Sequence, residues 1–195
     1  MMKLHLYGDG PRDEITLKPL LERLLSVDVD PKFQAWARLN KATGYDRKVL
    51  YAIISAQNEK AHGLVAVCDA DKDPKRLAAL RAGRESHRSK SPPFPTALGQ
   101  ADPHGEAWLL DDPKAVREAL GLERGVEIAN VRKCHPKAEL GRLIQEAGRD
   151  PSEALAAISE HVDPKRCNHA SETGLSAFLE DVREELGPQA RAIST

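Results

Sequence analysis

The chain has 195 residues, of which 41% are hydrophobic and 30% charged, and its formal net charge is -1. These proportions are typical of a globular protein with a sizeable core. Because the net charge is nearly balanced, they exclude a protein that binds nucleic acid through overall basicity, so any such binding requires a local cluster of cations. Aromatic residues make up only 4%, which disfavours a base-stacking surface for single strands.

The sequence contains no pattern of secretion or membrane insertion. Its apolar runs are far shorter than the roughly 20 residues that a transmembrane helix requires. The first residues lack the apolar stretch of a signal peptide, and three cysteines are an odd, sparse set for a disulfide framework. We therefore expect a cytoplasmic protein with reduced thiols.

The first half of the chain predicts alternating strands and helices. A short strand pattern opens the chain and breaks at residues 8–11, and apolar residues at three- and four-residue spacing then predict a helix. Because proline removes a hydrogen bond from a helix interior, we expect this helix to begin at Pro19, after an irregular entry over residues 13–18. Further predictions are a helix over 46–62, a strand buried on both faces over 63–69, and a helix from Pro74.

The second half predicts helices after a proline-rich loop over residues 90–103, with a short strand near 96–101. Helices are expected near 104–111, from Pro113, and within 135–148, 151–162 and 172–187, with frayed residues at 188–195. This order predicts an α/β fold, in which helices flank a mostly parallel sheet, with a helical C-terminal third. We assign residues 1–130 to the α/β domain and 131–195 to a helical extension packed on it.

Acidic residues gather where two predicted strands end. The first group is Asp9, Asp13 and Glu14, and the second is Asp69, Asp71 and Asp73. Ligands of open parallel sheets bind beyond the carboxyl ends of the strands, and carboxylates from neighbouring strands would there offer the oxygen ligands that Mg²⁺ and Mn²⁺ prefer. Two such ions could serve phosphodiester hydrolysis. The alternative is that these acids cap helices, for which Asp73 is well placed before Pro74.

The segments LYGDGPRDE and VAVCDADKD resemble the Toprim domain, the catalytic fold of primases, topoisomerases and OLD-type nucleases. With EAWLLDDPKAVREAL, HPKAELGRLI and FLEDVREEL, nearly the whole chain is similar to a family of small Toprim-like proteins associated with ABC- or OLD-type ATPases. The resemblance implies a Toprim, Rossmann-like fold. It also implies a Mg²⁺- or Mn²⁺-dependent nuclease acting on DNA or RNA, tRNA included, as the effector of an ATPase-linked prokaryotic anti-phage defence system.

The resemblance also implies roles for single residues. Asp69 and Asp71 match the Asp-x-Asp pair, and Gly10 matches the glycine of the first motif, but the glutamate expected before that glycine is Asp9 here. Either Asp9 binds the metal or Glu14 reaches back to do so, and the shorter side chain puts catalysis in question more than metal binding. The implied metal ligands are Asp9, Asp69, Asp71 and Asp73. The implied catalytic residues are Asp9, Glu14, Asp69, Asp71, Glu106 and Lys137.

Two of these residues and a basic segment have alternative explanations. Glu106 opens a predicted helix, where a carboxylate suits the helix dipole whether or not it is a ligand. Lys137 also begins a helix, and it either neutralises a scissile phosphate or is solvated. The basic residues of segment 75–90 form either a phosphate-binding surface near the acids or a solvated helix face.

Three functions stay open at this point. The first is the nuclease, with DNA or tRNA as substrate and an ABC- or OLD-type ATPase as partner. The second is a regulatory or interaction subunit with a decayed metal site, whose work is to bind that ATPase. The third is phosphoryl transfer on a small nucleotide. A monomer and an oligomer are compatible with each.

Overall fold

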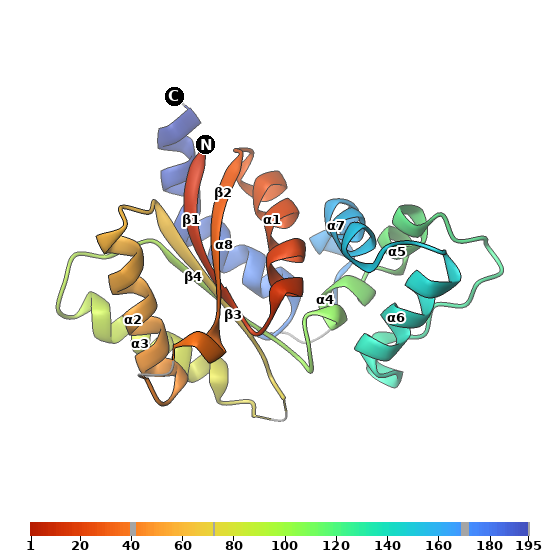
Figure 1. Ribbon diagram of the computed structural model, residues 1–195, viewed down its shortest axis with the longest axis horizontal. Helices are drawn as coiled ribbons and strands as arrows, with labels where there is room; N and C mark the ends of the chain where they lie inside the picture. The colour runs from red at the N-terminus through yellow and green to blue at the C-terminus, as the bar shows by residue number, and fades with distance from the viewer. Residues whose placement is uncertain (40–41, 72, 169–171, 195) are drawn as a thin grey trace.

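A four-stranded parallel sheet forms the centre of the computed structural model, which describes residues 1–39, 42–71, 73–168 and 172–194 (Figure 1). The strand order is β2-β1-β3-β4, and all three pairings are parallel. The strands are β1 (Met2–Gly8), β2 (Val29–Ala35), β3 (Gly63–Asp69) and β4 (Thr96–Ala101). With helices on its flanks, this sheet confirms the predicted α/β, Rossmann-like class.

Helices follow the strands on both faces of the sheet. The α-helices are α1 (Pro11–Leu25), α2 (Tyr45–Asn58), α3 (Arg76–Arg88), α4 (Glu106–Leu110), α5 (Pro113–Leu120), α6 (Pro136–Glu146), α7 (Pro151–His161) and α8 (Leu175–Ser194). Short 3-10 helices are η1 (Trp36–Arg38), η2 (Val131–Lys133) and η3 (Pro164–Arg166). One apolar core lies between the sheet and α2 with α3, and a second lies between the sheet and α1 with α8.

Successive side chains of β3 belong alternately to the two cores. Val65 and Val67 belong to the core under α1 and α8, whereas Leu64, Ala66 and Cys68 belong to the core under α2 and α3. Residues 63–68 are all buried, as expected for a strand covered on both faces. The continuous apolar run of this strand is therefore explained by its central position in the sheet.

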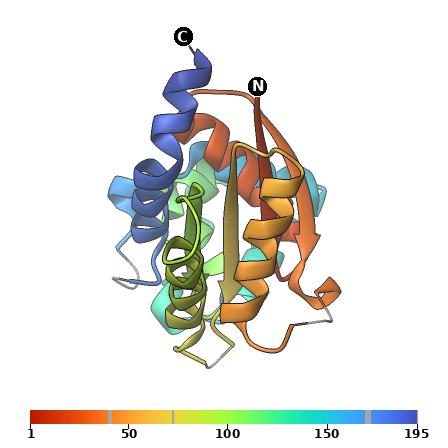
Figure 2. The same ribbon diagram turned by 90° about the vertical axis from the view of Figure 1, so that its left-hand side faces the viewer.

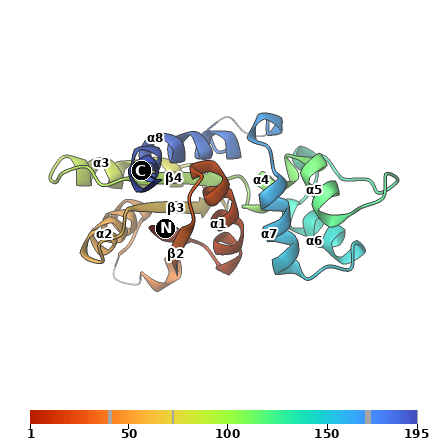
Figure 3. The same cartoon turned by 90° about the horizontal axis from the view of Figure 1, so that it is seen from above.

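The chain leaves the sheet after β4 and later returns to it. Helices α4 to α7 gather beyond α1, and α7 packs against both α1 and α5 (Figures 1 and 3). Helix α8 then comes back to pack along β4, beside α3 (Figure 2). The α8 residue Asp181 accepts hydrogen bonds from the Arg84 guanidinium at 2.9 Å and from the Leu98 N–H at 2.7 Å. Within the described ranges, no helix is long and apolar enough to cross a membrane.

Several expectations about helix ends are wrong. The helix expected from Pro74 begins at Arg76, and the helix expected over 46–62 ends at Asn58. Helix α1 begins at Pro11 and contains Pro19, because proline suits the first turn and the buried leucines of this helix outweigh one lost hydrogen bond. Helix α8 continues through Pro188 to Ser194 instead of fraying after residue 187. Burial of Ala190 on the core holds this last part in place.

Strand β2 is absent from the sequence prediction. Its residues VDPKFQA include a proline and several polar residues, which lower β-propensity. The strand lies at the edge of the sheet and pairs only with β1, so Pro31 and its polar neighbours are tolerated there.

Candidate metal and active site

The carboxyl ends of β1 and β3 form the topological switch point of the sheet. From β1 the chain crosses to β2 on one side, and from β3 it crosses to β4 on the other. Open α/β sheets bind ligands at such a point. Asp9 follows β1 and Asp69 ends β3, and the Asp9 Oδ2 accepts a hydrogen bond of 2.6 Å from the Asp69 N–H. The two acidic groups thus follow neighbouring strands, which is the condition on which a shared site depended.

Asp69, Asp71 and His104 bring their ligand atoms together. One oxygen or nitrogen from each lies within 4.8 Å of the others. His104 Nδ1 is 3.3 Å from Asp69 Oδ2 and 3.6 Å from Asp71 Oδ1, and the Gly105 N–H donates to Asp69 Oδ1 at 3.0 Å. Sequence reasoning missed His104, although it comes three residues after the predicted strand at 96–101 and so had the position expected of a site residue.

Asp13, in the first turn of α1, contacts the backbone that carries Asp9. Its Oδ2 accepts hydrogen bonds from the N–H groups of Asp9 at 2.6 Å and Gly10 at 3.0 Å. A Cβ on Gly8 would lie 2.5 Å from the same oxygen, so the close approach of Asp13 to β1 requires glycine there. Burial raises the pKa of Asp13 to about 6, and the charges of Asp69 and Asp9 add to the rise against the opposing N–H of Gly10.

The pKa of Asp69 is also raised. Burial is the largest cause, and the charge of Asp9 adds to it, whereas the Gly105 N–H and His104 act in the opposite direction. For both carboxyl groups burial is the main cause of the raised pKa, and the charges of neighbouring aspartates add to it. Carboxylates with raised pKa values at a switch point are the electrostatic pattern of a functional site, and a bound cation would relieve their repulsion.

Tyr45 is the first residue of α2 and Arg76 the first residue of α3, and both contact the acidic residues. The Arg76 Nη1 donates to Asp69 O at 2.8 Å and to Asp71 Oδ2 at 3.0 Å, and its guanidinium lies over the Tyr45 ring. The Tyr45 hydroxyl donates to Asp9 Oδ1 at 3.4 Å. Asp71 has a φ of 44°, in the left-handed region that aspartate tolerates better than most residues. Tyr45 was not among the predicted residues, and Arg76 was counted only in the basic segment.

The remaining predicted residues lie outside this group. Asp73 Oδ1 accepts from the Lys75 N–H at 3.0 Å, in the turn that precedes α3. Because α3 begins at Arg76 with Lys75 as its N-cap, the expectation that Asp73 caps this helix is wrong. The side chain of Glu14 makes no hydrogen bond or ion pair with any residue that the structure describes. Glu106 pairs with Arg12 at 3.0 Å, and both line a cavity together with Lys137.

Most arginines of the basic segment are engaged in ion pairs within the protein. Arg84 contacts Asp181 at 2.9 Å, and Arg88 contacts Glu185 at 2.5 Å. These pairs hold α3 to α8, so a phosphate-binding role for the segment is left mainly to its remaining cations.

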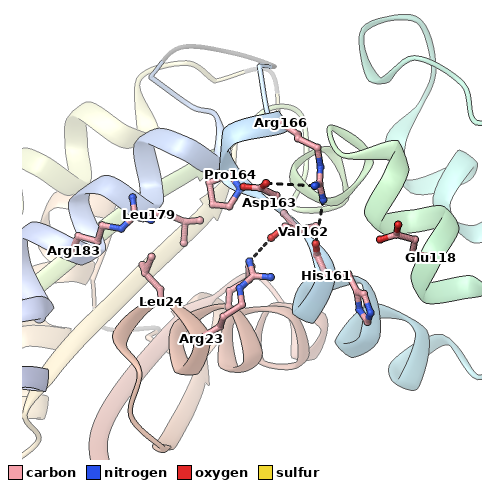
Figure 4. A pocket seen from close by; sticks show the side chains of 11 residues that line it. Arg23, Leu24, Glu118, His161, Val162, Asp163, Pro164, Arg166, Leu179 and Arg183 are labelled. Carbon is pink, nitrogen blue, oxygen red and sulfur yellow. Dashed lines mark hydrogen bonds and ion pairs between the residues drawn. The ribbon is translucent and has the colours of Figure 1, made fainter. Parts of the chain in front are cut away.

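A second, larger cavity of about 480 Å³ lies between α1, η3 and α8 (Figure 4). The Arg23 guanidinium donates to the Val162 carbonyl, and Arg166 pairs with Asp163. These arginines already bind protein groups, and the acids described above do not line this cavity. Arg23 and Arg166 therefore serve the packing of helices, and the acidic group stays the candidate site.

Comparisons with protein-family models, with curated proteins and with solved structures found no significant match for this chain. The Toprim resemblance therefore stays a prediction from the sequence segments quoted above.

The donor atoms at the switch point fit a divalent cation. Asp69 and Asp71 offer carboxylate oxygens, which suit Mg²⁺ and Mn²⁺, and His104 offers a nitrogen, which favours a first-row transition ion over Mg²⁺. Asp9 lies against the backbone of Asp69 and adds a third carboxylate beside them.

Proposed function

We propose that this protein is a metal-dependent nuclease of the Toprim type that hydrolyses phosphodiester bonds in DNA or RNA. The observation that carries the proposal is the convergence of Asp69, Asp71 and His104 at the switch point, where the Asp9 carboxylate accepts a hydrogen bond from the Asp69 backbone. Raised pKa values at Asp13 and Asp69, caused mainly by burial and increased by neighbouring aspartates, add support because shifted carboxyl groups gather at functional sites.

Asp69, Asp71 and His104 would hold Mg²⁺ or Mn²⁺, with Asp9 beside them. When bound, the ion would supply Lewis-acid polarisation of the phosphate and a water of lowered pKa. Asp13 holds the Asp9–Gly10 turn through two hydrogen bonds, and so it sets the position of the Asp9 carboxylate. With a pKa of about 6, Asp13 can also accept or donate a proton near neutral pH.

One observation favours a second function. Asp71, a proposed ligand, already pairs with Arg76 at 3.0 Å. A site in which a guanidinium replaces part of the metal's charge is what we expect of a regulatory subunit that has lost catalysis. Such a protein would act by binding an ABC- or OLD-type ATPase. In either case we place the protein in an ATPase-linked anti-phage defence system of the cytoplasm, on the sequence resemblance alone.

A cleavage assay separates the two functions. The chain, alone and with the ATPase, is incubated with plasmid, linear DNA and tRNA in Mg²⁺, Mn²⁺ or chelator. We expect metal-dependent cleavage that disappears when both Asp69 and Asp71 are replaced by alanine. Undiminished cleavage by this double variant would refute the metal-nuclease mechanism. Absence of cleavage in every condition, with ATPase binding retained in the variant, would establish the regulatory function instead.

A further inference from the structure

A cavity of about 350 Å³ lies beside the candidate metal site, between the helices α4, α6 and α7. Leu140, Ile144 and Leu155 provide apolar walls. Arg12, Glu106 and Leu155 also line a small neighbouring cavity that includes Asp13 and Gly105. Because the two cavities share these three wall residues, the larger one lies next to the residues that support Asp9 and Asp69.

The charge of this cavity is positive, although the net charge of the chain is -1. Its acid, Glu106, is paired with Arg12 at 3.0 Å. Lys137 and Arg149 also line it, and neither has an acidic partner among the residues that the structure describes. Arg149 donates a hydrogen bond of 3.4 Å to the Ala119 carbonyl. Two cations without an acidic partner, next to aliphatic walls, are complementary to a ligand that joins a negative group to an apolar ring.

We infer that this cavity binds one unpaired nucleotide of the nucleic-acid substrate, with its base against Leu140, Ile144 and Leu155 and its phosphate near Lys137 and Arg149. The inference rests on the proposed function, which supplies the class of substrate. A cavity of this volume is at the small end of ligand pockets, which suits a single nucleotide and excludes a duplex.

The substrate must therefore present an unpaired base. A base enters a protein pocket only after it leaves the stack, which costs least where the strand is already unpaired. Gln145 also lines the cavity, and its amide offers both a donor and an acceptor to the edge of a base. The preferred substrate is accordingly a loop or a single-stranded segment.

Gly141 provides a variant that adds a side chain at the wall of the cavity. It lies within α6 and lines the cavity, and a Cβ built on it meets no atom within 4 Å. Leucine is also a better helix former than glycine, so Gly141→Leu should fold with equal or greater stability. Gly125→Leu is the matched control, because Gly125 is an exposed glycine with the same free space and lines neither of these two cavities.

The test is a fluorescence titration in chelator, where no cleavage occurs. The probes are a labelled hairpin with an unpaired loop and a fully paired duplex of equal length. We expect the unmodified protein and Gly125→Leu to bind the hairpin more tightly than the duplex. Gly141→Leu should bind the hairpin about tenfold more weakly and the duplex as before. Lys137→Ala should also weaken hairpin binding, and thermal melting checks that each variant is folded.

Two results would overturn the inference. One is hairpin binding by Gly141→Leu that equals binding by the unmodified protein. The other is the absence of any hairpin preference in the unmodified protein. A parallel cleavage assay in Mn²⁺ tests the proposed function separately. Retained hairpin preference without cleavage in any metal would refute the nuclease and leave the nucleotide pocket standing, whereas cleavage without that preference would refute the pocket alone.

Discussion

The side chain of Asp9 accepts a hydrogen bond of 2.6 Å from the backbone N–H of Asp69. This contact joins the residue that follows β1 to the last residue of β3, across the switch point of the sheet. Aspartate thus reaches the neighbouring strand although it is one methylene shorter than the glutamate that the Toprim resemblance implies. Asp9 therefore both fixes the end of β3 and adds negative charge beside Asp69 and Asp71.

Replacement of Asp9 by asparagine should abolish most metal-dependent cleavage. The amide oxygen can still accept the hydrogen bond of Asp69, so the fold is kept while the charge that attracts the cation is lost. We expect a fall of about a hundredfold in the cleavage rate. Asp30→Asn, on the exposed side of β2, is the control and should cleave normally. Normal cleavage by Asp9→Asn together with loss of cleavage in Glu14→Gln would show that Glu14 is the ligand.

Mn²⁺ binding should depend on Asp69 and Asp71 but not on Asp73. The first two belong to the group of converging ligand atoms, whereas Asp73 accepts a hydrogen bond from the Lys75 N–H in the turn before α3. Calorimetry should therefore detect no Mn²⁺ binding after Asp69→Ala with Asp71→Ala, and unchanged affinity after Asp73→Ala. Loss of Mn²⁺ binding in Asp73→Ala, with unchanged affinity in the double variant, would show that the ion binds before the start of α3 instead.

Asp112 should stabilise the fold in a pH-dependent manner. Burial alone would raise its pKa, but hydrogen bonds from Arg166 and from the Asp163 and Ala115 N–H groups lower the pKa overall. Because the folded pKa lies below the unfolded value of about 3.9, the stabilisation is complete above that pH and is lost as the pH falls through the folded pKa.

Asp112→Asn should accordingly lower the free energy of unfolding by about 2–4 kcal/mol at neutral pH, and by less near pH 3. Urea unfolding at the two pH values measures both effects. Glu123→Gln, at an exposed position of the α5–α6 connection, should leave the free energy of unfolding unchanged. If Asp112→Asn lowers the free energy of unfolding equally at both pH values, the lost charge of Asp112 is not the cause of the destabilisation.

Asp181→Ala should destabilise the packing of α8 on the sheet. It would leave the largely buried Arg84 without its closest acidic partner, and the N–H of Leu98 in β4 without an acceptor. We expect a loss of about 2–4 kcal/mol in denaturant unfolding. Glu180→Ala, one residue away and exposed, is the control. Equal stability of the two variants would show that the contacts of Asp181 do not hold α8 on the sheet.

The sequence by itself determined the elements whose local pattern is strong. The continuous apolar run of residues 63–69 predicted a buried strand, and three-to-four spacing predicted most helices, because burial imposes its period directly on the chain. It also located Asp9, Asp69 and Asp71 at strand ends. It failed for β2, whose edge position tolerates a proline, and for the ends of α1 and α8, where packing outweighs the local effect of proline.

Only the tertiary structure decided which residues meet. The order β2-β1-β3-β4 makes β1 and β3 neighbours, and so it sets Asp9 against Asp69 across 60 positions of sequence. His104, Tyr45 and Arg76 join them from three other segments. His104 had only its position after a predicted strand as a signal, and no local pattern distinguishes Tyr45 and Arg76 from ordinary surface residues. The physical reason is that periodicity records whether a side chain is buried, whereas a site depends on which strand ends the topology brings side by side.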